Sequence, residues 1–342
     1  MRLLHIHLPS RAPALYPPYG LASRLQEQLR RRQLDFKDAA RPPPPGVTAP
    51  PPPPTLLSFT PLPVYTLGRR QTAPLTDAEV ARLQAPLHNH MRSNHPSASP
   101  RSTSSSGGGG GGGGGDSASL PVAIVNSPRG GLTTYHGPGQ VVLWPVLDLR
   151  SRYHRQFTVR CYSRLLEDTT IATLKSRFGL QAFTTDDPGV WVQQSLAASG
   201  GQPAKIAALG VHLRRHVSAL GTAINVDMPG DKVRDEQLNP WARIVACGLE
   251  GKTVASVAGE SSATVTGGFV AREGEEEQGV AAAWAEELAS RISVEGVETM
   301  AHDDVVGLLD ALVQEGGAGD ERTAETAAQE LAYVEVIRRF GQ

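Results

Sequence analysis

Twelve residues near the middle of the chain, Arg129 to Gln140, combine backbone freedom with side chains that can do chemistry. They read Arg-Gly-Gly-Leu-Thr-Thr-Tyr-His-Gly-Pro-Gly-Gln, so five of them are Gly or Pro. Glycine lets a ligand approach the main chain closely, and proline fixes a turn. Arg129, Tyr135 and His136 are left to contact a bound molecule. A plain turn would also accommodate His136, so the residue types alone leave its role open.

Cys247 is the candidate nucleophile. It precedes Gly248 in a glycine-punctuated loop, which can present a sulfur to solvent and direct N–H groups at an oxyanion. Only the thiolate attacks, so the thiol needs a nearby cation or base that lowers its pKa. A lone cysteine is more often a small buried hydrophobe. That description fits the other cysteine, Cys161, on the apolar face of an expected helix.

Lys205 is the candidate cation. Most lysines are solvated surface charges, but Lys205 opens the apolar run Lys-Ile-Ala-Ala-Leu-Gly-Val. A lysine that enters such a strand is partly desolvated, which lowers its pKa and makes it a usable proton donor and acceptor. The sequence separation of Lys205 and Cys247 says nothing about whether they meet.

The elements that must position these residues follow from apolar periodicity. Strands are expected at 3–8, 120–125, 141–149, 189–192, 205–213 and 220–226. Residues 55–67, with Pro61 and Pro63, are expected at a sheet edge or a loop entry. Helices are expected at 19–32, 153–178, 281–292, 305–314 and 323–340, and residues 76–79 are expected to open a short helix with a capping box. Because the strands lie between helices rather than alternating with them, the sequence favours an α+β fold with a mixed β-sheet flanked by helices.

Low-complexity segments interrupt the 342 residues. Residues 41–54 are Pro-rich, and 93–119 are Ser-rich with nine consecutive glycines. Residues 258–279 form a third, Gly/Glu-rich segment that is expected to be a loop. We therefore expect residues 1–342 to form a single catalytic domain with disordered insertions.

Composition excludes several function classes. The net charge is −1, which gives no indication of a nucleic-acid partner. The two cysteines have no Cys-x-x-Cys spacing, which argues against a disulfide framework and against structural zinc. No apolar run has the length of a membrane span. Basic clusters at 30–32 and 214–216 fit either a solvated helix face or a docking patch for an acidic carrier protein.

Seven segments, in this order along the chain, resemble the lipoyl(octanoyl) transferase family. They are residues 19–27, 63–69, 129–140, 189–192, 205–211, 221–226 and 244–248. Several ordered matches separated by long spacers are more specific than any one of them. The resemblance implies the biotin/lipoate protein ligase-like fold.

The resemblance also implies acyl transfer by a cysteine–lysine dyad. Cys247 would take the octanoyl group from octanoyl-acyl carrier protein as a thioester, and Lys205 would move the proton. The acceptor would be a lysine of a lipoyl domain, as in the glycine cleavage H protein and the 2-oxoacid dehydrogenase acyltransferase subunits. No metal or cofactor is required, and a monomer is expected.

The family's acyl and carrier-arm site, carried over residue by residue, is a set of mostly small residues. They are Arg129, Gly130, Gly131, Leu132, Thr133, Thr134, Tyr135, His136, Ala208, Leu209, Gly210, Gly221, Thr222 and Ala223. The chain departs from the family at two positions. Leu220 stands where the family usually has His, and Ala246 stands where it usually has Pro.

Two other functions stay open. An ATP-dependent lipoate or biotin protein ligase would share the fold but would not need Cys247. A non-catalytic lipoyl-domain-binding module would be consistent with Leu220 and Ala246. Proline and glycine tracts are typical of eukaryotic chains, in which lipoylation is mitochondrial, and residues 1–26 lack acidic residues. A mitochondrial location is therefore expected, although the domain is expected to begin at Leu3.

Overall fold

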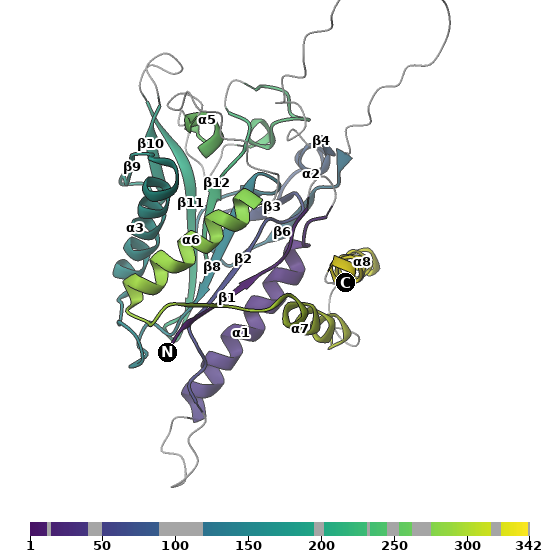
Figure 1. Cartoon of the computed structure of the whole chain (residues 1–342). Coiled ribbons are helices and arrows are strands. Elements are labelled where there is room, and N and C mark those ends of the chain that lie inside the picture. Colours follow the sequence, from purple (N-terminus) through teal and green to yellow (C-terminus); the bar gives the residue numbers. More distant parts are fainter. Residues whose placement is uncertain are drawn as a thin grey trace, which may run out of the picture.

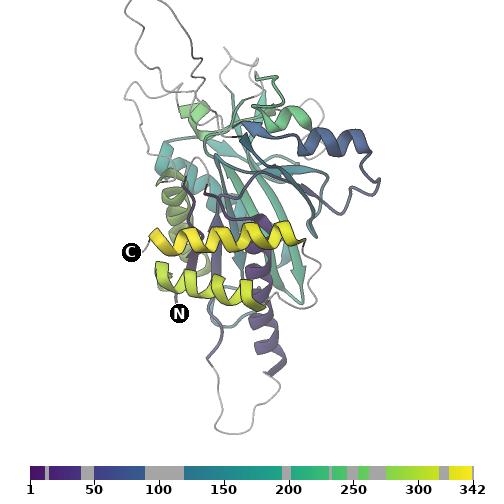
Figure 2. The ribbon, with the colours of Figure 1, turned by 90° about the vertical axis from the view of Figure 1, so that its right-hand side faces the viewer.

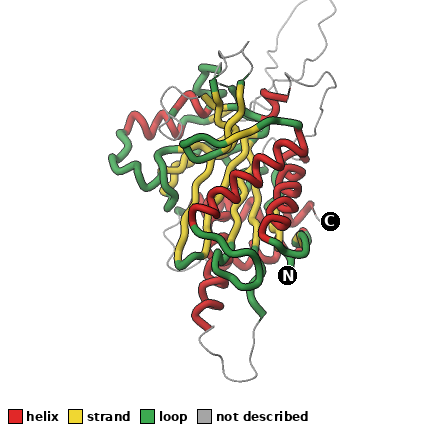
Figure 3. The backbone as a smooth tube through the Cα atoms, turned by 90° about the vertical axis from the view of Figure 1, so that its left-hand side faces the viewer, coloured by secondary structure: helices red, strands yellow, loops and turns green. Residues whose placement is uncertain are grey.

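A mixed β-sheet with helices on both faces forms the centre of the molecule (Figure 1, Figure 3). This computed structural model describes residues 1–11, 15–39, 50–88, 119–194, 202–230, 233–244, 253–261, 275–315 and 323–340. Residues 41–49 and 93–118 of the first two expected insertions lie outside this set. The expected α+β fold with a mixed sheet is confirmed.

Nine strands make up the main sheet, in the order β14-β1-β2-β8-β12-β11-β10-β9, with β13 beside β11. Their bounds are β1 Leu3–His7, β2 Thr55–Phe59, β8 Gln140–Val146, β9 Ala182–Phe183, β10 Val190–Gln193, β11 Pro203–Arg214, β12 Val217–Asn225, β13 Thr253–Val254 and β14 Val297–Thr299. Strand β1 is parallel to β14 and β2, and β13 is parallel to β11. The other neighbours are antiparallel.

Two hydrophobic clusters cover the two faces of this sheet, because side chains alternate along each strand. Helices α3 (Val159–Phe178) and α6 (Glu275–Ile292) share one cluster with inward residues such as Leu56. Helices α1 (Tyr19–Ala39), α7 (His302–Glu315) and α8 (Ala324–Phe340) share the other with residues such as Leu57. Figure 2 shows α7 and α8 lying side by side across α1. We call these the α3/α6 face and the α1 face.

Smaller elements close one end of the sheet. Strands β3 (Val64–Leu67), β6 (Ala123–Asn126) and β7 (Thr134–His136) form a three-stranded sheet, and β4 (Leu87–His88) pairs with β5 (Ser119–Leu120). A third cluster, which includes Tyr65, Tyr135 and Trp241, packs beneath them. Helix α2 (Asp77–Gln84) begins with the expected capping box between Thr76 and Glu79. The remaining elements of the described residues are the 3₁₀ helix η2 (Pro240–Arg243) and helix α5 (Val257–Ser261).

The structure corrects two expectations for helix α3. The helix begins at Val159 rather than at residue 153, because Thr158 caps it and accepts a hydrogen bond from the Cys161 amide. Cys161 therefore lies in the first turn and is exposed, not buried in the core.

Two further expectations also change. Strand β2 lies inside the sheet, between β1 and β8, because it ends at Phe59 and so precedes both Pro61 and Pro63. The expected loop 258–279 is shorter at both ends. Residues 258–261 belong to α5, and α6 begins at Glu275, where acidic residues are favourable at a helix N-terminus.

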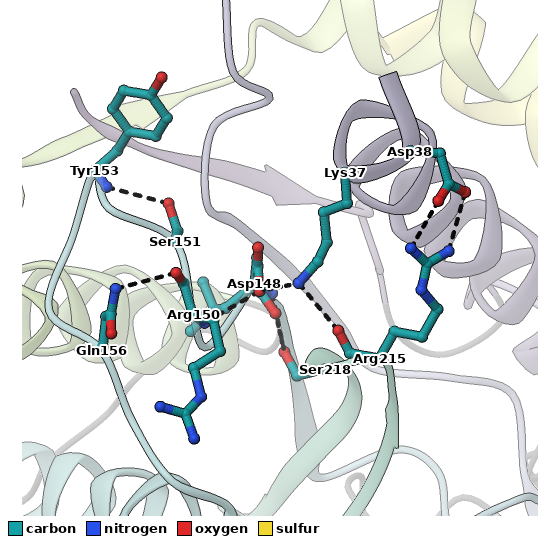
Figure 4. A network of polar contacts seen from close by, with 10 residues as sticks. Lys37, Asp38, Asp148, Arg150, Ser151, Tyr153, Gln156, Arg215 and Ser218 are labelled. Carbon is teal, nitrogen blue, oxygen red and sulfur yellow. Dashed lines mark hydrogen bonds and ion pairs between the residues drawn. The ribbon is translucent and has the colours of Figure 1, made fainter. Parts of the chain in front are cut away.

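Polar contacts fasten the C-terminal end of α1 to the turn between β11 and β12 (Figure 4). The ammonium of Lys37 donates to Asp148 at 2.7 Å and to the carbonyl of Arg215 at 3.0 Å. The Arg215 guanidinium donates to both carboxylate oxygens of Asp38, at 2.6 and 3.0 Å. Arg215, from one of the expected basic clusters, is thus engaged within the fold. The contacts hold α1 along the sheet, where it packs against β8 and β12.

Buried histidines should make the fold sensitive to acid. His5 Nε2 and His7 Nδ1 both lie 2.8 Å from the Ser58 hydroxyl. Burial lowers the pKa of His5 from 6.5 to about 4 and that of His7 to about 3, the latter also through the charge of His5. Between these values and 6.5 the unfolded chain binds more protons, so the free energy of unfolding falls as the pH falls.

We expect a loss of about 2 kcal/mol for each of the two histidines between pH 7 and about pH 5. Urea unfolding of the full chain at both pH values measures this. A double variant, His5→Gln with His7→Gln, should lose most of the dependence. Equal pH dependence in both proteins would contradict the prediction.

Candidate active site

A pocket opens on the α1 face of the sheet, beside the Arg129–Gln140 loop. It contains about 390 Å³ of space, part of it open to solvent. Its lining comes from α1, β7, β8, β11, β12 and Arg129, and comprises Tyr19, Arg129, Thr134, His136, Trp144, Ala208, Leu209, Gly210, Leu220, Gly221, Thr222 and Ala223. Nine of the fourteen residues predicted to bind substrate are in this set. The structure thus brings together three segments that are far apart in the sequence.

The two parts of the Arg129 side chain have different roles, since the methylene groups line the pocket and the guanidinium stabilises the fold. Its Nη2 donates to the Thr66 carbonyl at 2.6 Å and to the Thr66 hydroxyl at 2.8 Å. The stem lies over Gly210, where an added Cβ would come within 2.9 Å of the Arg129 Cδ. The guanidinium therefore holds the loop on β3, while the methylene groups form a wall of the pocket.

A chain of amide hydrogen bonds orients His136. Its Nδ1 lies 2.7 Å from Gln140 Oε1, Gln140 donates to Asn225 at 2.9 Å, and Asn225 donates to the Ala255 carbonyl at 3.0 Å. Because Gln140 directs its oxygen at the ring, His136 carries its proton on Nδ1 and presents Nε2 as an acceptor. Burial lowers the pKa of His136 to about 4, so the ring is neutral at physiological pH. The Tyr19 ring stacks on it at 5.9 Å.

The other five predicted residues do not line the pocket. Tyr135 points to the opposite side of β7 and packs against Tyr65 and Trp241, because neighbours on a strand face opposite ways. The remaining four shape the loop and comprise Gly130, Gly131, Leu132 and Thr133. The Gly131 carbonyl, for example, accepts a hydrogen bond from the Arg70 amide at 3.1 Å.

Lys205 is a buried cation with a defined setting. Its side chain is only 8% exposed, and its Nζ donates to the Pro188 carbonyl at 3.0 Å. The ammonium also lies 4.7 Å from the centroid of the Trp191 ring. Gly189 makes this possible, since its φ is +127° and a Cβ there would come within 2.6 Å of the Ala207 carbonyl oxygen. The expectation that Lys205 enters an apolar strand is confirmed.

A β-bulge directs Lys205 to the pocket side of the sheet. The pairing of β10 with β11 shifts by one residue, so that Val190 pairs with Ala207 while Trp191 pairs with Lys205. The extra residue is Ile206, and both Ile206 and Ala207 face the α3/α6 cluster. Lys205 and Ala208 therefore both lie on the other face, the α1 face, although they are three positions apart. Without the bulge they would lie on opposite faces.

Cys247 and Ala246 lie outside the described residues, which end at Ile244 and resume at Thr253. The chain that resumes at Thr253 lies beside Lys205. Val254 is the strand partner of Lys205, and the Ala255 amide donates to the Lys205 carbonyl at 3.0 Å. Ile244 and Val254 also pack against the same hydrophobic cluster.

Three residues of the lining were not among the predicted binding residues: Tyr19, Trp144 and Leu220. Tyr19 lies in an amphipathic helix and Trp144 in an apolar strand, and in such elements the sequence pattern predicts that an aromatic residue belongs to the hydrophobic core. Of these three residues, only Leu220 could be singled out from the sequence, because it stands where the family usually has His.

No cluster of three or more His, Cys, Asp or Glu side chains in the described ranges has the arrangement of a metal site. None of the helices described is both long and apolar enough to span a membrane.

Comparisons with known proteins identify the family of this chain. Residues 116–267 match the family of the lipoyl protein ligase A/B catalytic domain. The chain is 41% identical over 134 residues to a probable octanoyltransferase of Schizosaccharomyces pombe, covering 39% of this chain and 52% of the relative. It is 33% identical over 206 residues to the mitochondrial octanoyl-[acyl-carrier-protein]:protein N-octanoyltransferase of Danio rerio, covering 60% of this chain and 67% of the relative.

Among solved structures, the chain is similar to a bi-partite lipoate protein ligase of Thermoplasma acidophilum. The TM-score is 0.47 and the identity 14%, with 91% of each chain covered. The match to the curated S. pombe relative spans only about half of that protein.

Proposed function

Because this chain belongs to the lipoyl(octanoyl) transferase family, we propose that it transfers an octanoyl group from octanoyl-acyl carrier protein to a lysine of a lipoyl domain. The acceptors would be the lipoyl domains of the glycine cleavage H protein and of 2-oxoacid dehydrogenase acyltransferase subunits. We also propose that it acts as a monomer and that it is located in the mitochondrion. The second proposal rests on the relative from Danio rerio, whose name gives a mitochondrial location.

The proposed reaction has two half-reactions. The Cys247 thiolate attacks the thioester carbonyl, a new carbon–sulfur bond forms, and the bond to the carrier arm breaks. The departing carrier thiolate takes a proton from the Lys205 ammonium. The acceptor amine then attacks the acyl-enzyme, an amide forms, and the Cys247 thiolate leaves. Lys205 takes the surplus proton from the amine and returns to its starting state.

The setting of Lys205 is the observation that carries this proposal. A buried ammonium stabilises a nearby thiolate more strongly than a solvated one, because protein screens charge less than water does. The bulge at Ile206 keeps Lys205 on the pocket face, and the chain that contains Cys247 rejoins the sheet at its strand partner, Val254. Substrate and dyad would therefore meet at one end of the pocket.

The pocket suits a flexible apolar chain. Its walls include Trp144, Leu220 and the small residues Ala208 and Ala223, so methylene groups can pack against side chains and backbone. We propose that the nine lining residues predicted from the sequence bind the acyl chain and the start of the carrier arm. His136 would accept a hydrogen bond there through Nε2.

An ATP-dependent ligase is the second candidate, because the matched domain family includes lipoyl protein ligases. A ligase must form an adenylate before it transfers the acyl group, whereas a thioester donor is already activated. The two functions therefore differ in whether transfer needs ATP and in whether it needs Cys247.

Mass spectrometry of the intact protein after incubation with octanoyl-acyl carrier protein, without ATP, tests the proposal. We expect one octanoyl adduct, which disappears in Cys247→Ser and persists in Cys161→Ser. Cys161 is the matched control because it is exposed and lies on α3. A lipoyl domain added to the wild-type adduct should become octanoylated. An adduct in Cys247→Ser, or no adduct without ATP, would refute the mechanism.

A further inference from the structure

Leu220 has a backbone conformation that leucine rarely adopts. Its φ is +61°, in the left-handed region, although it lies within strand β12. A non-glycine residue there costs about 1 kcal/mol or more, and such strain tends to be kept where the position has a function. Leu220 is one of the pocket-lining residues, and its side chain is only 6% exposed.

The positive φ turns the Leu220 side chain onto the α1 face. In a regular strand Leu220 would face the same way as Ile224, which packs in the α3/α6 cluster. Its strand partner Val211 also packs against that cluster. Leu220 instead packs with Val217 and Ala223 on the α1 face, where the pocket lies. The strained backbone thus places a leucine where an ordinary strand would not put one.

A buried glutamine on α1 supports this conformation. Gln26 Oε1 accepts a hydrogen bond from the Leu220 amide at 3.1 Å, and both residues are buried. The bond gives the Leu220 N–H a partner on the α1 side of the sheet, and it joins the wall of the pocket to α1. The position of the Leu220 side chain is therefore set by its backbone conformation and by the contact with α1, and not by the choice of a side-chain rotamer.

Leu220 lies at the end of the pocket far from Lys205. It pairs with Val211, six positions beyond Lys205 on β11, and one of those positions is the bulge at Ile206. At about 3.3 Å per residue the two ends are roughly 16 Å apart along the strand. An extended eight-carbon chain, with bonds of about 1.5 Å, spans roughly 10 Å. The rest of the distance along the strand is taken up by the Lys205 side chain, the reacting thioester and the Leu220 side chain.

We infer that Leu220 is the end wall of the acyl pocket and sets the longest acyl chain that the enzyme accepts. This inference rests on the proposed function and adds its chain-length specificity. A chain longer than octanoyl would meet the leucine side chain, which Gln26 and the backbone hold in place. A smaller residue would open the pocket toward α1, and a larger one would shorten it.

The test uses the full chain and hexanoyl, octanoyl, decanoyl and dodecanoyl thioesters of acyl carrier protein, with kcat/KM measured for each. Leu220→Ala should raise the ratio of decanoyl to octanoyl transfer by roughly tenfold, because an extra methylene group in an apolar pocket changes kcat/KM by a factor of this size. Leu220→Phe should raise the ratio of hexanoyl to octanoyl transfer. The larger residue supplies a test even if the alanine variant folds poorly. Val217→Ala, on the same strand and in the same cluster but outside the pocket, should keep the wild-type ratios.

The outcomes separate the inference from the function on which it rests. Wild-type protein that transfers no acyl group from the carrier would overturn the proposed function. Wild-type protein that transfers octanoyl groups, together with Leu220 variants whose ratios stay within about twofold of wild type, would overturn only the role of Leu220.

Discussion

Replacing Lys205 with methionine should lower kcat/KM for octanoyl transfer by about a thousandfold. Methionine fills a similar volume but carries no charge and no exchangeable proton. The Cys247 thiol would then lose the cation that favours its ionised form, and the carrier thiolate would lose its proton donor. In the proposed mechanism both half-reactions depend on the same nitrogen, so acylation and transfer should slow together.

Arginine should not rescue this loss. Lys205→Arg keeps a positive charge but holds its proton at every accessible pH, so it cannot return a proton between the half-reactions. We expect the arginine variant to form some acyl-enzyme in a single turnover and to transfer it slowly. Lys37→Met is the matched control, because Lys37 binds Asp148 at the far end of α1 and does not line the pocket. Wild-type rates in Lys205→Met would remove Lys205 from the mechanism.

The loop beside the pocket could be predicted because its chemistry is local. Gly, Pro, Arg and His within twelve residues indicate a candidate ligand loop without knowledge of the fold, and the structure puts Arg129, Thr134 and His136 around one pocket. One residue of this loop, Tyr135, could not be placed in the same way. Tyr135 is equally polar and equally placed in the motif, yet β7 turns it into the cluster with Trp241. Only the strand pairing decides which of two adjacent side chains faces the pocket.

Two decisive features of the site left no mark in the sequence pattern. The bulge at Ile206 follows from how β10 and β11 pair, and Ile206 by itself reads as an ordinary strand residue. The positive φ of Leu220 is likewise invisible, since leucine gives no signal for the left-handed region. Both features are long-range in origin, and both reverse the face on which a functional side chain lies. Periodicity arguments assume that such reversals do not occur.

Gly221→Ala should destabilise the protein by about 3 kcal/mol or more, because the added methyl group would overlap the backbone of the neighbouring strand. Gly221 lies where β12 meets β8. A Cβ there would come within 2.2 Å of the Leu143 carbonyl oxygen and 2.8 Å of the Pro145 Cδ. The first contact is with backbone in the middle of the sheet, so no side chain can rotate away to relieve it. Thr222, the next residue, pairs directly with Leu143, which keeps the two strands in register.

Gly210→Ala is the matched comparison, because Gly210 and Gly221 are direct partners across β11 and β12. Its Cβ would meet the Arg129 Cδ at 2.9 Å, a flexible stem that can shift, so the loss of stability should be about 1 kcal/mol or less. That shift would narrow the pocket and slow octanoyl transfer. Urea unfolding should therefore separate the two variants, since a backbone clash lowers the free energy of unfolding and a side-chain clash mainly alters the pocket. Equal stability of the two would show that β8 and β12 can move apart, and that the pocket floor is less rigid than these contacts require.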